Sequence, residues 1–242
     1  MKLRDYQLEA IRKMKTGCIL NGGVGSGKSL TSLSYYYMQN GGSEIFLTGG
    51  KHKKMKDPKD LYIITTARKR DTMEWEGELS HFLLSTNPDT SAYKNKVIVD
   101  SWNNVKKYKE VKGAFFIFDE QRVVGSGEWV KSFLKIAKTN EWILLSATPG
   151  DTWSDYIPVF IANGFYKNKT EFLREHAVFA RYSKFPKIEK WMGSGKLNRY
   201  RRMILVDMKF QRKTEQHHED VYVDYDIATY KDVMKSRWDI YK

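Results

Sequence analysis

The sequence predicts an α/β domain in which a parallel β-sheet is flanked by helices. Over about the first 150 residues, short apolar segments alternate with segments of helical pattern, which is typical of βαβ units. Polar signatures directly follow three of the apolar segments. Because open α/β sheets bind their ligands at the carboxyl ends of the strands, the sequence predicts a ligand site at that edge of the sheet.

The apolar pattern gives the order of the expected elements. An amphipathic helix over 3–15 precedes a strand at 18–20 and a helix over 30–38. Further strands are expected at 44–48, 61–66, 97–99, 114–118 and 142–145. Further helices are expected at 68–84, 102–109, 129–138, 153–164 and 169–179. The chain is basic and aromatic with little periodicity over 181–213, and then a strand at 221–225 and a helix from 227 are expected.

Length and composition exclude several classes of protein. The 242 residues, 41% of them hydrophobic, suit one α/β domain with or without an appendage. No apolar run is long enough for a transmembrane helix, and no apolar leader resembles a secretory signal. A single cysteine, Cys18, excludes a disulfide framework and a cysteine zinc site. These features predict a cytoplasmic protein without a membrane partner and without structural zinc.

The balance of charge favours a polyanionic partner. Lys and Arg number 42 against 29 Asp and Glu, which leaves a net charge of +13. Nucleic acid is the usual partner of such a chain, although solubility alone can also account for a positive charge. The lysine-rich loop at 51–59 is either simply exposed or a grip on DNA. The tract from Arg181 to Arg202 mixes cations with aromatic rings, which suits nucleic-acid contact or packing against another domain.

Residues Gly22 to Ser29 fit the P-loop pattern G-x-x-x-x-G-K-[ST]. Their glycines let the backbone curl so that several N–H groups point at one phosphate chain, and the following helix adds its positive end. Lys28 would reach the β- and γ-phosphates, and the Ser29 hydroxyl would ligate Mg²⁺. A Gly-rich turn with a chance lysine is the alternative. The strand before the motif and the helix after it favour the P-loop.

An acidic pair, Asp119-Glu120, ends the apolar segment 115–118. In P-loop ATPases such a strand end is the Walker B element. The aspartate would hold Mg²⁺, usually through water, and the glutamate would polarise the attacking water as a general base. An acidic pair can also simply begin a loop. Its position on a separate strand after a strong P-loop favours the catalytic interpretation.

A third signature, Ser146-Ala147-Thr148-Pro149, follows the apolar segment 142–145. Alone it would predict only a turn. Together with Leu3-Arg4-Asp5-Tyr6-Gln7, GGVGSGKS, IITT and FDEQ in this order, it resembles the first RecA-like motor domain of a superfamily 2 helicase. The resemblance is greatest to the Swi/Snf-type translocase branch in a phage-encoded form. It covers about residues 1–165 with specific motifs and the rest of the chain more loosely.

The resemblance implies ATP and Mg²⁺ as cofactors and assigns individual residues to them. In the family, a glutamine ahead of the P-loop reads the adenine edge, and this position maps to Gln7. The residues implied in nucleotide binding are Arg4, Gln7, Gly23, Gly25, Ser26, Gly27, Lys28, Ser29 and Leu30. The implied catalytic residues are Lys28, Asp119 and Glu120, and the implied Mg²⁺ ligands are Ser29 and Asp119.

The resemblance also implies DNA as a partner and residues that couple it to the nucleotide. The implied coupling residues are Gln121, Arg122, Ser146, Ala147 and Thr148. The implied nucleic-acid contacts are Thr66, Arg68, Ser101 and Trp102. Two departures from the family pattern put coupling in doubt. Arg122 stands where histidine or aspartate is common, and Ala147 stands where the Swi/Snf branch often has glycine.

Residues 1–180 are therefore expected to form a first RecA-like ATP-binding domain. Residues 181–242 are expected to be a basic extension and linker toward a second RecA-like domain that this chain lacks. In the family, arginines from that second domain assist hydrolysis. The expected function is the ATP-binding half of a nucleic-acid-dependent ATPase motor, in a bacterial host's cytoplasm if phage-encoded.

Two alternatives stay open at this point. The chain could be an isolated ATP- and DNA-binding module with little turnover of its own. It could also be another P-loop enzyme, such as a packaging motor. The R-x-Y-Q element at Arg4 to Gln7 is a helicase feature and argues against the second alternative.

Overall fold

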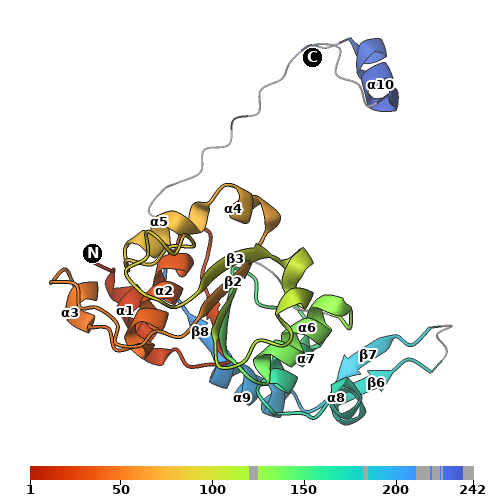
Figure 1. Cartoon of the computed structure of the whole chain (residues 1–242). Coiled ribbons are helices and arrows are strands. Elements are labelled where there is room, and N and C mark those ends of the chain that lie inside the picture. The colour runs from red at the N-terminus through yellow and green to blue at the C-terminus, as the bar shows by residue number, and fades with distance from the viewer. Residues whose placement is uncertain (120–124, 182–184, 211–218, 220–223, 225, 237–242) are drawn as a thin grey trace. The chain divides into compact units, whose positions relative to one another are not determined.

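The structure is a computed structural model that describes residues 1–119, 125–181, 185–210, 219, 224 and 226–236 (Figure 1). The chain divides into two units, Met1–Phe210 and Gln211–Lys242. In the second unit the described residues form one helix, α10 (Ile227–Ser236), where a helix was predicted. Of the strand predicted at 221–225, only Asp224 lies within the described residues.

A six-stranded parallel sheet forms the centre of the first unit among the described residues. The strand order is β3-β2-β4-β5-β1-β8. The strands are β1 (Ile19–Asn21), β2 (Leu61–Thr65), β3 (Val97–Ser101), β4 (Phe115–Asp119), β5 (Glu141–Ser146) and β8 (Leu205–Asp207). All residues of β2 and β4 are buried, because these inner strands are covered on both faces, as their continuous apolar runs indicate.

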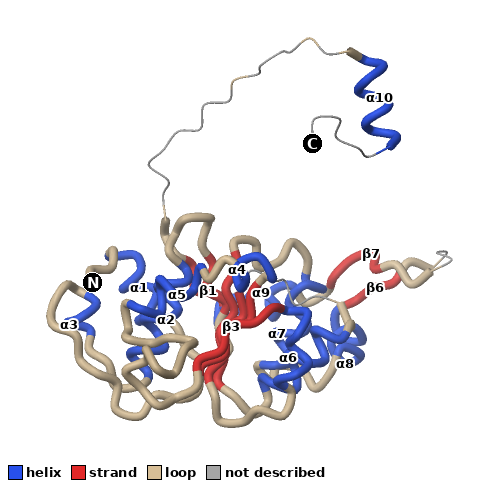
Figure 2. The backbone as a smooth tube through the Cα atoms, turned by 45° about the horizontal axis from the view of Figure 1, so that its top comes forward, coloured by secondary structure: helices blue, strands red, loops and turns tan. Residues whose placement is uncertain are grey.

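Helices cover both faces of this sheet (Figure 2). One layer contains α1 (Asp5–Lys13), α2 (Lys28–Gln39) and α5 (Glu74–Ser80). The other contains the 3₁₀-helix η1 (Trp102–Tyr108), α6 (Glu128–Ala137), α7 (Trp153–Ala162), α8 (Lys169–His176) and α9 (Ser194–Ile204). Successive strand residues point to opposite layers, so Ile63 packs in the first core and Ile64 in the second.

The strand predicted at 44–48 is wrong, because these residues form the helix α3 (Glu44–Leu47). The Ser43 side chain accepts a hydrogen bond from the Ile45 backbone N–H and so caps the helix. Phe46 and Leu47 are buried while Ile45 is exposed. The apolar residues of this segment predicted a strand, but the cap that Ser43 provides favours a helix.

The helix predicted over 68–84 is divided into two. α4 (Ala67–Asp71) ends before Met73, whose φ of 53° is left-handed, and α5 begins at Glu74. α5 buries Trp75 and Leu79, which lie one helical turn apart. Similarly, the helix predicted over 169–179 ends at His176. Residues Ala177–Phe179 instead form β6, which pairs with β7 (Ile188–Trp191) in a two-stranded antiparallel sheet.

The first unit continues past residue 180, where the sequence placed the domain boundary. β8 pairs in parallel with β1, and the Asn21 amide donates a hydrogen bond of 2.7 Å to the Asp207 carboxylate. The ring of Tyr200, on α9, stacks on Phe165 with 4.3 Å between ring centroids. Part of the basic and aromatic tract therefore packs inside this unit. No helix among the described residues is long and apolar enough to cross a membrane.

Candidate functional site

Three of the predicted signatures meet in one cavity at the carboxyl ends of β1, β4 and β5. These strands are neighbours in the sheet, and Asn21 lies in register with Ser146 while Asp119 lies beside Leu145. The cavity has a volume of about 500 Å³. Its lining residues are Val24, Gly25, Gly27, Lys28, Ser29, Lys69, Asp119, Ser146, Ala147 and Thr148.

The loop between β1 and α2 has a backbone conformation that requires glycine. Gly25 and Gly27 both have φ of +79°, in the left-handed region. A Cβ added at Gly23 or Gly25 would meet no atom within 4 Å, so the backbone is open on that side. The same loop leads directly into α2, whose first residue is Lys28. This is the arrangement of backbone that an anion can approach closely.

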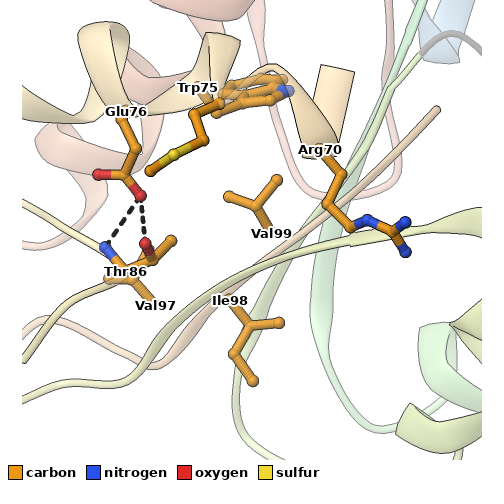
Figure 3. A pocket seen from close by; sticks show the side chains of 8 residues that line it. Arg70, Trp75, Glu76, Thr86, Val97, Ile98 and Val99 are labelled. Carbon is orange, nitrogen blue, oxygen red and sulfur yellow. Dashed lines mark hydrogen bonds between the residues drawn. The ribbon is translucent and has the colours of Figure 1, made fainter. Parts of the chain in front are cut away.

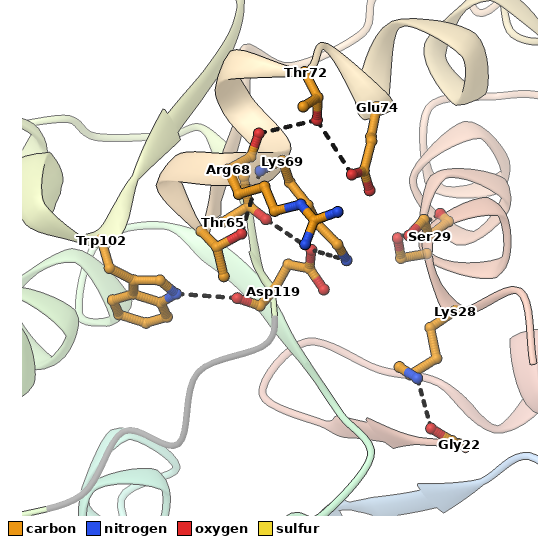
Figure 4. Close-up of polar contacts among 12 residues, drawn as sticks. Gly22, Lys28, Ser29, Thr65, Arg68, Lys69, Thr72, Glu74, Trp102 and Asp119 are labelled. Carbon is orange, nitrogen blue, oxygen red and sulfur yellow. Dashed lines mark hydrogen bonds and ion pairs between the residues drawn. The ribbon is translucent and has the colours of Figure 1, made fainter. Parts of the chain in front are cut away.

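Lys28 folds back onto its own loop (Figure 4). Its ammonium group donates hydrogen bonds to the backbone oxygens of Gly22, at 2.6 Å, and Gly23, at 3.0 Å. Ser29 lines the cavity one residue further along α2. The predicted phosphate-binding lysine and the predicted metal-binding hydroxyl therefore lie together at the start of this helix.

The Asp119 carboxylate is only 1% exposed and is held by groups from β2 and α4. Its Oδ2 accepts hydrogen bonds from the Thr65 hydroxyl, at 2.8 Å, and from the Lys69 ammonium, at 3.1 Å. Its backbone oxygen accepts a hydrogen bond of 3.0 Å from the Trp102 indole N–H. Oxygen ligands of this kind, together with the Ser29 hydroxyl, form a donor set that Mg²⁺ prefers.

The helix α1, which precedes the P-loop in the sequence, donates hydrogen bonds to the backbone of that loop. Gln7 is 5% exposed, and its side-chain amide donates to Thr31 Oγ1, at 3.2 Å, and to the Gly27 backbone oxygen, at 3.5 Å. The Tyr6 hydroxyl donates to the Ser26 backbone oxygen at 3.1 Å. Neither Gln7 nor the exposed Arg4 lines the cavity. The adenine contact predicted for Gln7 stays a prediction.

Three other residues predicted to bind the nucleotide do not line the cavity. Ser26 is buried with its hydroxyl 3.9 Å from the Met208 sulfur. Gly23 and Leu30 are absent from the cavity lining. Glu120, Gln121 and Arg122 lie outside the described residues.

The predicted coupling residues at the end of β5 lie against the P-loop. The Ser146 backbone oxygen accepts a hydrogen bond of 3.1 Å from the Gly22 N–H. The Ser146 hydroxyl accepts a hydrogen bond of 3.1 Å from the Thr148 N–H. Ala147 and Thr148 are exposed and line the cavity. The predicted coupling role of these residues stays a prediction.

The four residues predicted to contact nucleic acid divide into two groups. Thr66 caps α4 by accepting a hydrogen bond from the Lys69 N–H, and Arg68 is exposed on the same helix. By contrast, Ser101 and Trp102 are 2% and 3% exposed. Their side chains support the interior and offer little surface to a nucleic acid.

Two polar residues near the cavity are not among the predicted site residues. Lys69 lines the cavity, and Asp100 lies near the end of β3. Burial alone would raise the pKa of the Asp100 carboxyl, but hydrogen bonds from Asn104, Tyr108, the Ser101 backbone and Arg70 hold it below the ordinary value. In the sequence, only the position of Asp100 directly after the apolar segment 97–99 pointed to it. In β3 it lies in register with Ile64 of the neighbouring strand β2.

A second cavity, of about 350 Å³, lies beside the edge strand β3 (Figure 3). It is lined by Arg70, Met73, Trp75, Glu76, Thr86 and Val97 to Val99. The Glu76 carboxylate accepts hydrogen bonds from the backbone N–H and the hydroxyl of Thr86. None of the predicted site residues lines this cavity.

The parallel sheet, its helical layers and its P-loop define a RecA-like α/β domain. In line with this, the structure is similar to the Sulfolobus solfataricus SWI2/SNF2 ATPase core, solved in complex with dsDNA. The TM-score is 0.59 at 17% sequence identity, over 85% of this chain and 44% of that one. The chain thus spans less than half the length of that ATPase core.

Two further solved structures match with lower scores. The Pyrococcus furiosus Hef helicase domain has a TM-score of 0.43 at 18% identity, over 74% of this chain and 41% of that one. A nuclease-deletion mutant of the type ISP restriction-modification enzyme LlaGI, in complex with a DNA substrate mimic, has a TM-score of 0.41 at 14% identity, over 63% of this chain and 18% of that one. The sequence matches no protein-family model and no curated protein.

Proposed function

We propose that this chain is the ATP-binding half of a DNA helicase or translocase of the Swi/Snf type. In this proposal it hydrolyses ATP with Mg²⁺ when a second RecA-like domain completes the site. The observation that carries the proposal is the single cavity lined by the glycine loop, Lys28, Ser29 and Asp119. Two predicted signatures that lie about 90 residues apart in the sequence contribute to this one site.

The loop and α2 supply the groups that bind a triphosphate. The open backbone at Gly23 and Gly25 lets phosphate oxygens approach the N–H groups, and the start of α2 adds a positive field. Lys28 now donates to two backbone carbonyls of its own loop. A triphosphate offers it charged acceptors in their place, and hydrogen bonds to charged groups are the stronger ones.

The residues present fit Mg²⁺. Asp119 provides a buried carboxylate, Ser29 provides a hydroxyl, and a cationic group already lies at the carboxylate. Mg²⁺ bound there would neutralise the charge that develops on the transferred phosphate. The role of this chain's residues is to hold the metal and the phosphates in a fixed relation. Glu120, which follows Asp119, is proposed to orient and deprotonate the attacking water.

DNA is the proposed partner, for three reasons. The net charge is +13, the exposed Arg68 stands on the helix that also carries Lys69, and the similar SWI2/SNF2 core is itself a complex with dsDNA. The partial coverage of that core favours a second domain outside this chain. An ATP- and DNA-binding module with little turnover is the competing function, because arginines from a second domain would be missing.

Steady-state ATP hydrolysis with and without DNA distinguishes these functions. The motor function predicts a turnover that is slow without the second domain's arginines but is stimulated by DNA, and that is lost in both Lys28→Ala and Glu120→Gln, while the matched surface variant Lys94→Ala keeps it. Binding of ATP by the unmodified chain without turnover in the presence of DNA would favour the module. If a fluorescent ATP analogue does not bind the unmodified chain with Mg²⁺ present, the proposed function is wrong.

A further inference from the structure

Three consecutive cations on the short helix α4 have three different environments. Arg68 is exposed, and Arg70 bonds Asp100 Oδ1 and the Ser101 hydroxyl, each at 3.3 Å. Lys69 reaches from the same helix to Asp119, with 3.1 Å between its ammonium nitrogen and Oδ2 (Figure 4). Lys69 also lines the cavity that contains Lys28 and Ser29.

The ion pair between Lys69 and Asp119 is largely removed from water. The side chain of Lys69 is 20% exposed and that of Asp119 is 1% exposed. A buried carboxylate is strongly destabilised without a compensating charge, so a cation at this position stabilises the fold. Lysine is suited to a reversible pair, because its ammonium is a compact charge on a flexible stem.

Mg²⁺ and the Lys69 ammonium would compete for the same carboxylate. Asp119 is the proposed metal ligand, and its Oδ2 is the atom that Lys69 binds. Mg²⁺ demands a tight shell of oxygen ligands at about 2.0–2.1 Å. An ammonium in contact with Oδ2 occupies an acceptor position that Mg²⁺, or a water bound to it, would use, and its charge repels the metal, so the two cations compete for Asp119.

We infer that Lys69 is a built-in counter-ion of Asp119, which Mg²⁺ displaces when the nucleotide binds. The displaced ammonium then turns toward solvent, which its 20% exposed side chain and its flexible stem allow. Lys69 therefore leaves Asp119 when the metal binds, and this moves a side chain of α4, the helix that presents Arg68. This inference rests on the proposed function, because it concerns the metal at that same site.

The Mg²⁺ concentration that half-saturates the binding of a fluorescent ADP analogue tests the exchange. Lys69→Met keeps the apolar stem and removes the charge, so Mg²⁺ no longer competes with this ammonium at Asp119. We expect the half-saturating Mg²⁺ concentration to fall on the order of tenfold, which corresponds to about 1.4 kcal/mol. Lys69→Arg, which keeps a cation, should remain within about threefold of the unmodified chain. The matched surface variant Lys94→Met should not change the value.

Melting temperature gives a second measurement that does not depend on activity. Without Mg²⁺, Lys69→Met should melt below the unmodified chain, because Asp119 has lost its counter-ion. Mg²⁺ with ADP should raise its melting temperature by more than it raises that of the unmodified chain. If Lys69→Met does not fold, Lys69→Gln replaces it, because the neutral amide can still donate a hydrogen bond to Asp119.

The possible outcomes separate this inference from the proposed function. An unchanged or raised half-saturating Mg²⁺ concentration in the neutral Lys69 variants overturns the counter-ion role while leaving nucleotide binding established. Absence of Mg²⁺-dependent nucleotide binding by the unmodified chain instead overturns the proposed function itself.

Discussion

The indole N–H of Trp102 donates a hydrogen bond of 3.0 Å to the backbone oxygen of Asp119. Trp102 follows β3 and Asp119 ends β4, and β2 lies between these two strands in the sheet. The bond therefore spans the carboxyl ends of three strands. It connects a residue predicted to contact nucleic acid with the predicted metal ligand.

Replacing Trp102 with phenylalanine should disturb Asp119, the proposed metal ligand, while keeping most of the apolar packing. The variant leaves the buried Asp119 carbonyl without its indole donor, which costs about 1–3 kcal/mol in the free energy of unfolding. Denaturant unfolding measures this loss. Trp129→Phe is the matched control, because Trp129 is 37% exposed and its ring lies 6.0 Å from that of Trp102. Equal losses in the two variants would contradict the role of the hydrogen bond.

Lys28→Ala should abolish tight nucleotide binding without unfolding the chain. Hydrogen bonds to charged groups contribute about 1.5–3 kcal/mol, so the dissociation constant should rise about tenfold to a hundredfold. Lys28 donates to two backbone carbonyls of its own loop and is only partly buried, so the melting temperature without nucleotide should change little. Titration of a fluorescent nucleotide, alongside a melting curve, measures both. Unchanged affinity would show that the cavity does not bind phosphates through this lysine.

Gly27→Ala should destabilise the P-loop for two separate reasons. The residue has φ of +79°, and a left-handed conformation costs an alanine about 1–2 kcal/mol. In addition, the new Cβ would lie 2.6 Å from Gln7 Nε2, so the Gln7 side chain must move. Gly77→Ala provides a control of opposite sign. Gly77 lies inside α5 with no atom within 4 Å of an added Cβ, so alanine there should stabilise by about 0.5–1 kcal/mol. Urea denaturation of both variants checks the prediction.

Asp100 should make the stability of the fold depend on pH in acid. Its folded-state pKa is lowered from 3.8, so its stabilising effect is complete above that value and is lost as the pH falls through the folded pKa. Asp100→Asn removes the charge and should flatten this part of the profile of unfolding free energy between about pH 5 and pH 2. Asp71→Asn removes an exposed carboxylate that also binds Arg70, and it should change the stability by less than about 0.5 kcal/mol. A profile in acid that is identical for Asp100→Asn and the unmodified chain would contradict this assignment.

Arg68→Ala should weaken DNA binding in a salt-dependent way. If Arg68 contacts a backbone phosphate, its removal lowers the slope of log affinity against log salt by about one unit. Fluorescence anisotropy of a labelled oligonucleotide over a series of salt concentrations measures the slope. Arg12, on α1, is an exposed arginine paired with Glu44, and its replacement should leave the slope unchanged. An equal effect of both replacements would indicate a diffuse attraction by the net charge.

Contiguous patterns predicted the fold class, and they singled out Lys28, Ser29 and Asp119, which the structure brings to one cavity. The P-loop needs eight neighbouring residues, and the buried strands β2 and β4 are long apolar runs. Features that depend on three-dimensional pairing were missed. β8 has only three residues, too few for any periodicity, and it becomes a strand because β1 offers it an edge.

The hydrogen-bond partners of individual side chains could not be predicted from the sequence either. Lys69 stands between two arginines, and only the direction of α4 places it on Asp119 while Arg70 turns to Asp100. Gln7 was predicted to contact the nucleotide, and its amide bonds the P-loop and Thr31. For Lys69 and Gln7 the residue type indicated a polar contact, but the group that each side chain binds depends on how the elements pack.

The pairing of β8 with β1 has a consequence for how the chain folds during synthesis. The strand that leads into the P-loop gains its second neighbour from residues 205–207, and Met208 then contacts Ser26 within the loop. Translation proceeds from the N-terminus, so this glycine-rich loop is translated early, and Ser26 gains its contact with Met208 only about 180 residues later. A fragment cut at residue 180 would leave β1 as an unprotected edge. β8 is the edge strand of the longer unit, so what the shorter fragment loses are the contacts of β8 with β1 and of Met208 with Ser26, and it should unfold at a lower temperature than the 210-residue unit.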